Sequence, residues 1–187
     1  MSDSKDEIME ATYQALCRYG YAELTIEKIA EESEKAKSNI YYHFDDKEEL
    51  MLAFLDFMKL KLESELEKFE GHGKERFDDI LDLMLGIDDE EMWAFHKSLQ
   101  DLQARAQYQE EFAEKFKSLD QMLESELLNS IEEMGLNQAE TKAKLTLSII
   151  QGSLKRRLTY GNPDELKDIK REIKKINCQQ NGKIKNP

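Results

Sequence analysis

The sequence has few of the residues that mark secreted, fibrous or membrane proteins. Its 187 residues include only two cysteines, two prolines and eight glycines. Cys17 and Cys178 are too few and too far apart for a disulfide framework or a cysteine-based zinc site. No apolar run reaches about 20 residues, the length of a membrane-spanning helix, and the acidic N-terminus lacks the apolar segment of a secretory signal. We therefore expect a cytoplasmic protein with no membrane partner.

Positive charge is also scarce. The chain has 27 Lys and Arg against 40 Asp and Glu, which gives a net charge of −13. Residues 1–50 carry a net charge of −7, residues 51–154 of −12 and residues 155–187 of +6. Such a chain is not a nonspecific nucleic-acid binder, because phosphate repels it at long range. Any binding to DNA must therefore rest on local contacts.

Apolar residues recur at helical spacing along most of the chain. The first such run ends at Gly20, a typical helix stop, and Thr25 is a plausible N-cap for the next helix. We find no alternating strand pattern and no internal repeat. The sequence predicts an all-α protein of nine or ten helices. After the first run, the expected helices cover residues 26–32, 37–43, 47–69, 74–85, about 92–107, about 109–134, about 138–160 and about 164–176.

The first 45 residues predict three short helices with a tight turn before the third, as a helix-turn-helix requires. Over residues 5–55 the sequence resembles the N-terminal domain of TetR-type transcriptional repressors. The resemblance implies an all-α fold in which a three-helix, helix-turn-helix domain precedes a helical bundle for ligand binding and dimerisation. The segments that carry it are Gly20-Tyr21, Thr25-Ile26, Ile29-Ala30, Ile40-Tyr41-Tyr42-His43-Phe44 and Lys47-Glu48-Glu49-Leu50.

The resemblance also implies which residues contact DNA. The segment that starts at Lys37 matches the recognition helix, where lysine and asparagine suit guanine and adenine edges in the major groove. Lys37, Asn39 and Tyr41 match base-contacting positions. Thr25, Tyr42, His43 and Lys47 match phosphate-contacting positions, and Ser38 stands between Lys37 and Asn39. Lys47 is also near the start of the following helix, and a helix N-terminus favours phosphate. The predicted DNA-binding residues are Thr25, Lys37, Ser38, Asn39, Tyr41, Tyr42, His43 and Lys47.

The turn before the recognition helix departs from the family pattern, which has a small residue followed by Gly, Val and Ser. Here the turn reads Ser33-Glu34-Lys35-Ala36. Without glycine a left-handed residue costs on the order of 1 kcal/mol, and Ala36 cannot cap the following helix. We expect the fold to survive, with some change in the pose of the recognition helix.

The aromatic residues of this segment have a second interpretation as core side chains of a small helical domain. For Phe44 the core is favoured, whereas for Tyr42 a phosphate contact is favoured because the surrounding motifs match. For His43 a phosphate contact and a solvated helix end are equally open.

Large, soft side chains concentrate between residues 84 and 122. Core packing explains any single one of them, but the resemblance places an effector pocket among these helices, and methionine and aromatic residues suit an adaptable apolar cavity. His96 would add a polar group. We expect a small-molecule effector of apolar character, and no metal or other cofactor. The predicted pocket residues are Met84, Met92, Trp93, Phe95, His96, Phe112, Phe116 and Met122.

The two long helices expected over residues 109–134 and 138–160 carry several aliphatic residues. The resemblance assigns their outer face to a four-helix interface between two copies of the chain. The predicted interface residues are Leu123, Leu127, Ile131, Ile149, Ile150, Gly152 and Leu154.

The sequence therefore predicts three parts: a DNA-binding domain (1–48), an effector-binding and dimerisation domain (49–176) and a polar, flexible tail (177–187). The predicted function is that of a one-component repressor, a homodimer on palindromic double-stranded DNA that a small molecule releases. The alternative is an adaptor that uses the helix-turn-helix for protein contacts, which the acidic first 50 residues favour. An enzyme is disfavoured, because the sequence has no catalytic spacing, glycine-rich phosphate loop or nucleophile elbow.

Overall fold

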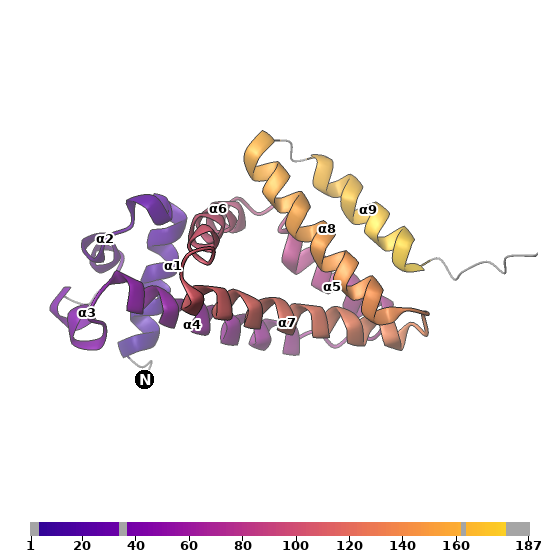
Figure 1. Ribbon diagram of the computed structural model, residues 1–187, viewed down its shortest axis with the longest axis horizontal. Coiled ribbons are helices and arrows are strands. Elements are labelled where there is room, and N and C mark those ends of the chain that lie inside the picture. Colours follow the sequence, from indigo (N-terminus) through magenta and orange to yellow (C-terminus); the bar gives the residue numbers. More distant parts are fainter. Residues whose placement is uncertain (1–3, 34–36, 162–163, 179–187) are drawn as a thin grey trace, which may run out of the picture. The chain divides into compact units, whose positions relative to one another are not determined.

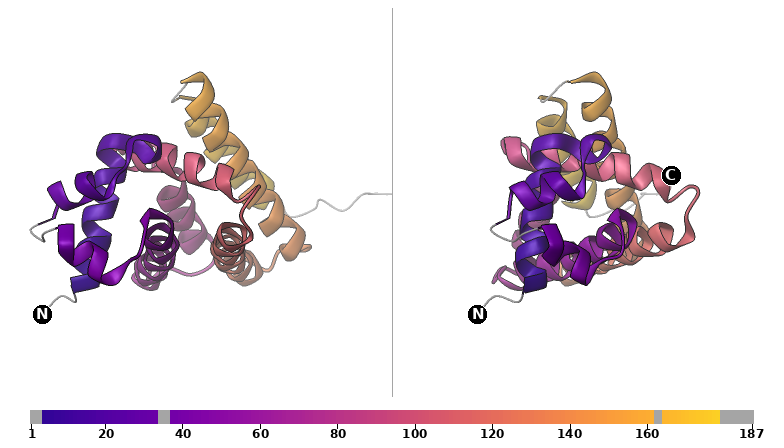
Figure 2. Two further views of the ribbon diagram at one scale, coloured as in Figure 1. Left: turned by 60° about the vertical axis from the view of Figure 1, so that its left-hand side comes forward. Right: turned by 90° about the vertical axis from the view of Figure 1, so that its left-hand side faces the viewer.

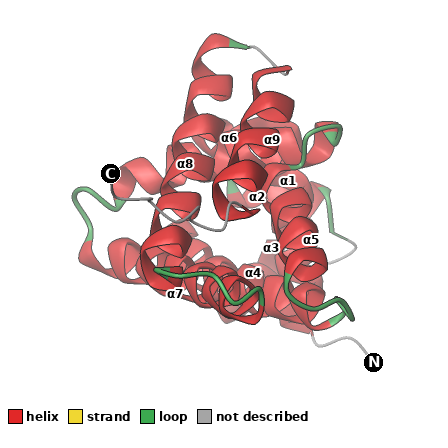
Figure 3. Ribbon diagram, turned by 90° about the vertical axis from the view of Figure 1, so that its right-hand side faces the viewer, coloured by secondary structure: helices red, strands yellow, loops and turns green. Residues whose placement is uncertain are grey.

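The computed structural model describes residues 4–33, 37–161 and 164–178, apart from the side chains of Lys37, Ser38 and Cys178. Within these ranges the chain forms nine helices and no strand, as the all-α prediction requires (Figures 1 and 3). No helix in the described ranges has the length and apolar character needed to cross a membrane. The helices are α1 (Ser4–Glu23), α2 (Ile26–Glu31), α3 (Lys37–His43), α4 (Lys47–Glu67), α5 (Lys74–Leu85), α6 (Glu90–Arg105), α7 (Glu110–Glu133), α8 (Ala139–Tyr160) and α9 (Asp164–Cys178).

Local chemistry explains several of the helix ends. Gly20, with φ 72° and ψ 164°, interrupts α1, and Tyr21 to Glu23 continue it as a short extra turn. Thr25 caps α2 as expected, because its Oγ1 accepts a hydrogen bond from the Lys28 N–H at 3.3 Å. Helix α6 starts two residues before the expected position because the Asp89 carboxylate caps it, accepting from the Met92 N–H at 2.9 Å.

Contacts divide the chain into two compact units. The first comprises residues 1–65 and 89–119, and the second comprises residues 66–88 and 120–187. The first unit thus contains α1–α3, most of α4, all of α6 and the first part of α7.

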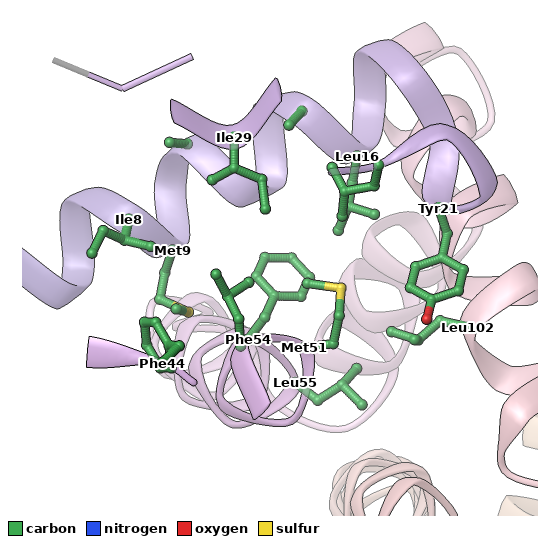
Figure 4. Packing of buried hydrophobic residues seen from close by; sticks show 14 of the residues in the cluster. Ile8, Met9, Leu16, Tyr21, Ile29, Phe44, Met51, Phe54, Leu55 and Leu102 are labelled. Carbon is green, nitrogen blue, oxygen red and sulfur yellow. The ribbon is translucent and has the colours of Figure 1, made fainter. Parts of the chain in front are cut away.

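The core of the first unit is built around α1. Met51 and Phe54 point from α4 toward Leu16 of α1 and Ile29 of α2 (Figure 4). Helix α6 covers another side of α1, where the buried Ser98 hydroxyl donates to the Leu16 carbonyl at 2.8 Å. The helix-turn-helix therefore shares one continuous apolar core with α4, α6 and the start of α7.

The second unit packs α5, α8 and α9 together with the C-terminal part of α7. Helices α8 and α9 lie side by side in all views (Figures 1 and 2). Leu166 and Ile173 of α9 are buried, and α9 also forms ion pairs with the acidic residues of α5 and the turn that follows it. These pairs are Lys174 Nζ to Asp78 Oδ2 (2.9 Å), Lys167 Nζ to Asp88 Oδ1 (3.0 Å) and Lys170 to Asp82.

Candidate DNA-binding site

Helix α3 has one buried face and one exposed face. Ile40 is fully buried and Phe44, just after the helix, is 5% exposed, which confirms the core interpretation of Phe44. On the other side Tyr41 is 48% exposed and Tyr42 is 82% exposed. Since residues four apart lie on the same side of a helix, Ile40 and Phe44 anchor α3 while the tyrosines face outward.

His43 and Thr25 border this exposed face. His43 is half-buried, and its ring meets that of Tyr42 edge-on at 5.1 Å between centroids. The exposed Thr25 hydroxyl caps α2 as an acceptor, so its own O–H keeps the ability to donate to an anion. Capping and an anion contact are thus compatible at Thr25.

Asn39 is half-buried, and its side chain is hydrogen-bonded to a residue outside α3. Its Nδ2 donates to the Ser4 Oγ at 2.8 Å, across 35 positions of the sequence. The predicted set did not include Ser4, and nothing in the sequence pattern pairs these two residues.

Lys47 makes internal contacts in the structure. Its Nζ donates to the Leu24 carbonyl at 2.7 Å and to the Tyr21 carbonyl at 3.0 Å, and it lies 4.2 Å from the centroid of the Tyr21 ring. Burial lowers the pKa of Lys47, and the charges of Arg105 and Lys28 lower it further. The ammonium therefore holds the connection between α1 and α2 against the first turn of α4.

Other cations of the helix-turn-helix are engaged in similar ways. Arg18 Nη1 pairs with Glu32 Oε1 at 2.9 Å, and Lys28 Nζ donates to the Glu23 carbonyl at 2.7 Å. The side chains of Lys37 and Ser38 and turn residues 34–36 lie outside the described residues. The predicted contacts of Lys37 and Ser38, and the predicted effect of the turn, therefore stay predictions.

Comparison with known proteins agrees with this geometry. Residues 8–54 match the family model described as bacterial regulatory proteins, tetR family. The crystal structure of a TetR transcription regulator from Haloarcula marismortui is similar over 94% of this chain and 96% of its own, with 30% sequence identity and a TM-score of 0.82. The chain belongs to the TetR family. This family consists of transcriptional regulators and not of enzymes.

Two other known proteins show how far the similarity extends. The transcriptional regulator QacR of Staphylococcus aureus is 34% identical over 64 residues, so the match spans about a third of that relative's length (34%). The crystal structure of a transcriptional regulator from Saccharomonospora viridis, in complex with choline, shares 18% identity and a TM-score of 0.74 over 94% of this chain and 96% of that one. The latter similarity concerns the fold.

The predicted pocket residues of this TetR-family chain fall into both compact units. Phe95, Phe112 and Phe116 are buried in the core of the first unit, and Met92 packs against that core. The Phe95 ring lies 4.9 Å from that of Tyr13 and 6.2 Å from that of Phe54. Met84 and Met122, both half-buried, belong to the second unit.

Trp93 and His96 are neighbours on α6. Both are half-buried, and their ring centroids lie 5.6 Å apart. Among the described residues, no group of three His, Cys, Asp or Glu side chains could hold a metal ion.

The predicted interface residues of the TetR-family chain differ in exposure. Leu123, Leu127, Ile131 and Ile150 are buried within the chain itself, so they contribute to the core of the second unit. Ile149 and Leu154 are half-buried. Gly152 is exposed, and no atom lies within 4 Å of the place that a Cβ would take there. Leu145, which is 52% exposed, lies one turn before Ile149 on α8.

We predict that Lys47→Met, which keeps the aliphatic stem, destabilises the fold. The Tyr21 and Leu24 carbonyls lose their charged donor, so the free energy of unfolding should fall by about 1–3 kcal/mol in a urea titration. The exposed Lys117→Met on α7 is the control and should stay within about 0.5 kcal/mol of the wild type. Equal stability of the two variants would show that the Lys47 ammonium does not hold this connection.

Proposed function

We propose that the chain is a ligand-responsive transcriptional repressor that binds a palindromic operator as a homodimer. The observation that carries this proposal is the two-sided α3, which is anchored by Ile40 and Phe44 and exposes Tyr41 and Tyr42. An adaptor would also need an exposed helix. Membership of a family of DNA-binding regulators favours DNA as the partner.

The DNA contacts divide by chemistry. We expect Lys37, Asn39 and Tyr41 to contact base edges in the major groove, with Ser38 between the first two, and Thr25, Tyr42 and His43 to donate to phosphates. Two of the three N–H groups of the Lys47 ammonium are bound to carbonyls, so at most one is left for a phosphate. Because residues 1–50 are net acidic, hydroxyl and amide donors carry much of the binding, and affinity for random DNA stays low.

The interface between the two copies lies on the exposed stripe of α8. Leu145, Ile149 and Gly152 follow at helical spacing, whereas the half-buried Leu154 lies on the opposite side of α8. Gly152 lets the partner backbone approach closely, because no side chain occupies the space there. A two-fold dimer of this kind buries well over about 1,200 Å² and suits a palindromic operator with half-sites about 34–36 Å apart.

The DNA-binding domain comprises residues 1–48, and residues 49–176 bind the effector and dimerise. The effector lies against the large side chains of the first unit, namely Met92, Trp93, Phe95, His96, Phe112 and Phe116. The choline complex of the structurally similar Saccharomonospora viridis protein supports the binding of a small organic molecule by this fold. The ligand releases DNA by favouring a conformation in which the two recognition helices no longer match the half-sites.

The operator experiment tests the function directly. Fragments of the source genome that the wild-type chain retains should contain a palindrome. Tyr42→Ala should then lower the operator affinity by about 10- to 100-fold, because the charge-assisted bond from the hydroxyl to phosphate is lost. Tyr108→Ala is the control, since Tyr108 is 88% exposed but lies outside the helix-turn-helix. Equal losses in both variants, or no retained fragment, would refute the proposal.

Dimerisation is tested on α8. Leu145→Glu should convert a dimer into a monomer at micromolar concentration in light scattering, because two carboxylates would be buried near the two-fold axis. Leu60→Glu on α4 is the matched control, since Leu60 is a leucine with a similarly exposed side chain, at 65% against 52% for Leu145. A monomeric wild type, or dissociation by Leu60→Glu alone, would contradict an interface on α8.

The effector is tested by native mass spectrometry of the purified chain. The wild type should carry a small molecule that is lost on denaturation, and Phe116→Ala should retain less of it because the ligand loses an aromatic contact. Phe69→Ala is the control, since Phe69 is half-buried and belongs to the second unit. Equal retention by the two variants would contradict the assigned pocket.

A further inference from the structure

We infer that Ser4 is a positioning residue that sets base specificity through Asn39. The inference rests on the proposed function, because it requires that α3 reads base edges. The observation that carries it is the hydrogen bond from Asn39 Nδ2 to Ser4 Oγ, 2.8 Å long, which joins the first residue of α1 to the exposed helix.

A second contact joins the same two parts of the chain. Lys5 Nζ lies 5.9 Å from the centroid of the Phe44 ring, and Phe44 follows α3 directly. The first turn of α1 therefore touches the recognition segment at Asn39 and at Phe44. Since Phe44 is itself buried, the start of α1 has a defined position relative to α3.

The amide chemistry determines what this contact does. An asparagine amide has two N–H donors on Nδ2 and two lone pairs on Oδ1. Ser4 holds the plane of the amide through one N–H of Nδ2. When this is the N–H that points away from Oδ1, the other N–H and Oδ1 stay together on the opposite edge. This edge offers a donor beside an acceptor, which is the complement of the N7 acceptor and N6 donor of adenine.

The held amide also resists rotation. A free asparagine amide adopts two orientations that exchange Oδ1 and Nδ2, and in the exchanged orientation it no longer complements adenine. Ser4 favours one of them and reduces the side-chain entropy lost on binding. Ser4 therefore increases discrimination at one base pair of each half-site without contacting the base itself.

The test is a panel of operators with every base at every half-site position, measured with the full-length chain. Asn39→Ala should remove the preference at one base pair. Ser4→Ala should reduce the adenine preference at that same base pair by about tenfold, within the range for one bidentate contact. Ser4→Thr keeps the hydroxyl and should restore the preference, while Ser64→Ala, an exposed serine of α4, should change nothing.

The double variant Ser4→Ala/Asn39→Ala completes a cycle. If Ser4 acts only through Asn39, adding Ser4→Ala to Asn39→Ala should have no further effect on base preference. The inference is wrong if Ser4→Ala weakens all operators equally, acts at another base pair or has no effect. In those cases a wild type that still selects its operator, and still depends on Tyr42, leaves the proposed function standing. A wild type that binds no operator would overturn both.

Discussion

The burial of α1 is the constraint on which the first unit depends. Ile8 and Ala15 are fully buried, and the buried Thr12 hydroxyl donates to the Ile8 carbonyl at 2.7 Å. Helices α2, α4 and α6 all pack around this one helix. A substitution in the α1 core should therefore affect the helix-turn-helix and the candidate effector residues together, because both belong to the same apolar cluster.

Three cationic side chains of the helix-turn-helix bind partners within the first unit. Arg18, Lys28 and Lys47 each bind a carboxylate or backbone carbonyl of the same unit, although the proposed ligand is a polyanion. Lys28 and Lys47 bind carbonyl groups at and after the C-terminal end of α1, which would otherwise need water. If the proposed function is correct, these cations attract DNA weakly, and affinity depends on the donors of the exposed face of α3.

The sequence alone was sufficient to predict the all-α helical fold and the family. Apolar residues at a spacing of three and four, together with glycine and capping side chains, act within a few residues, so several helix bounds follow from local chemistry. Thr25 as a cap and Phe44 as a core residue were predictable in this way. Where a bound shifted, as at Asp89, a competing local cap was the cause. The motifs from Gly20 to Leu50 identified the family because their order and spacing reflect one three-helix packing.

Only the tertiary structure determined which polar side chains form hydrogen bonds within the chain and which apolar side chains are buried. The bonds of Asn39 to Ser4 and of Lys47 to Tyr21 and Leu24 join residues 23 to 35 positions apart, and no local pattern encodes such pairs. Periodicity placed Ile149 and Ile150 on α8 without saying which one faces the core, yet only Ile150 is fully buried. The physical reason is that helical spacing defines a face, whereas the neighbours that cover this face come from distant parts of the chain.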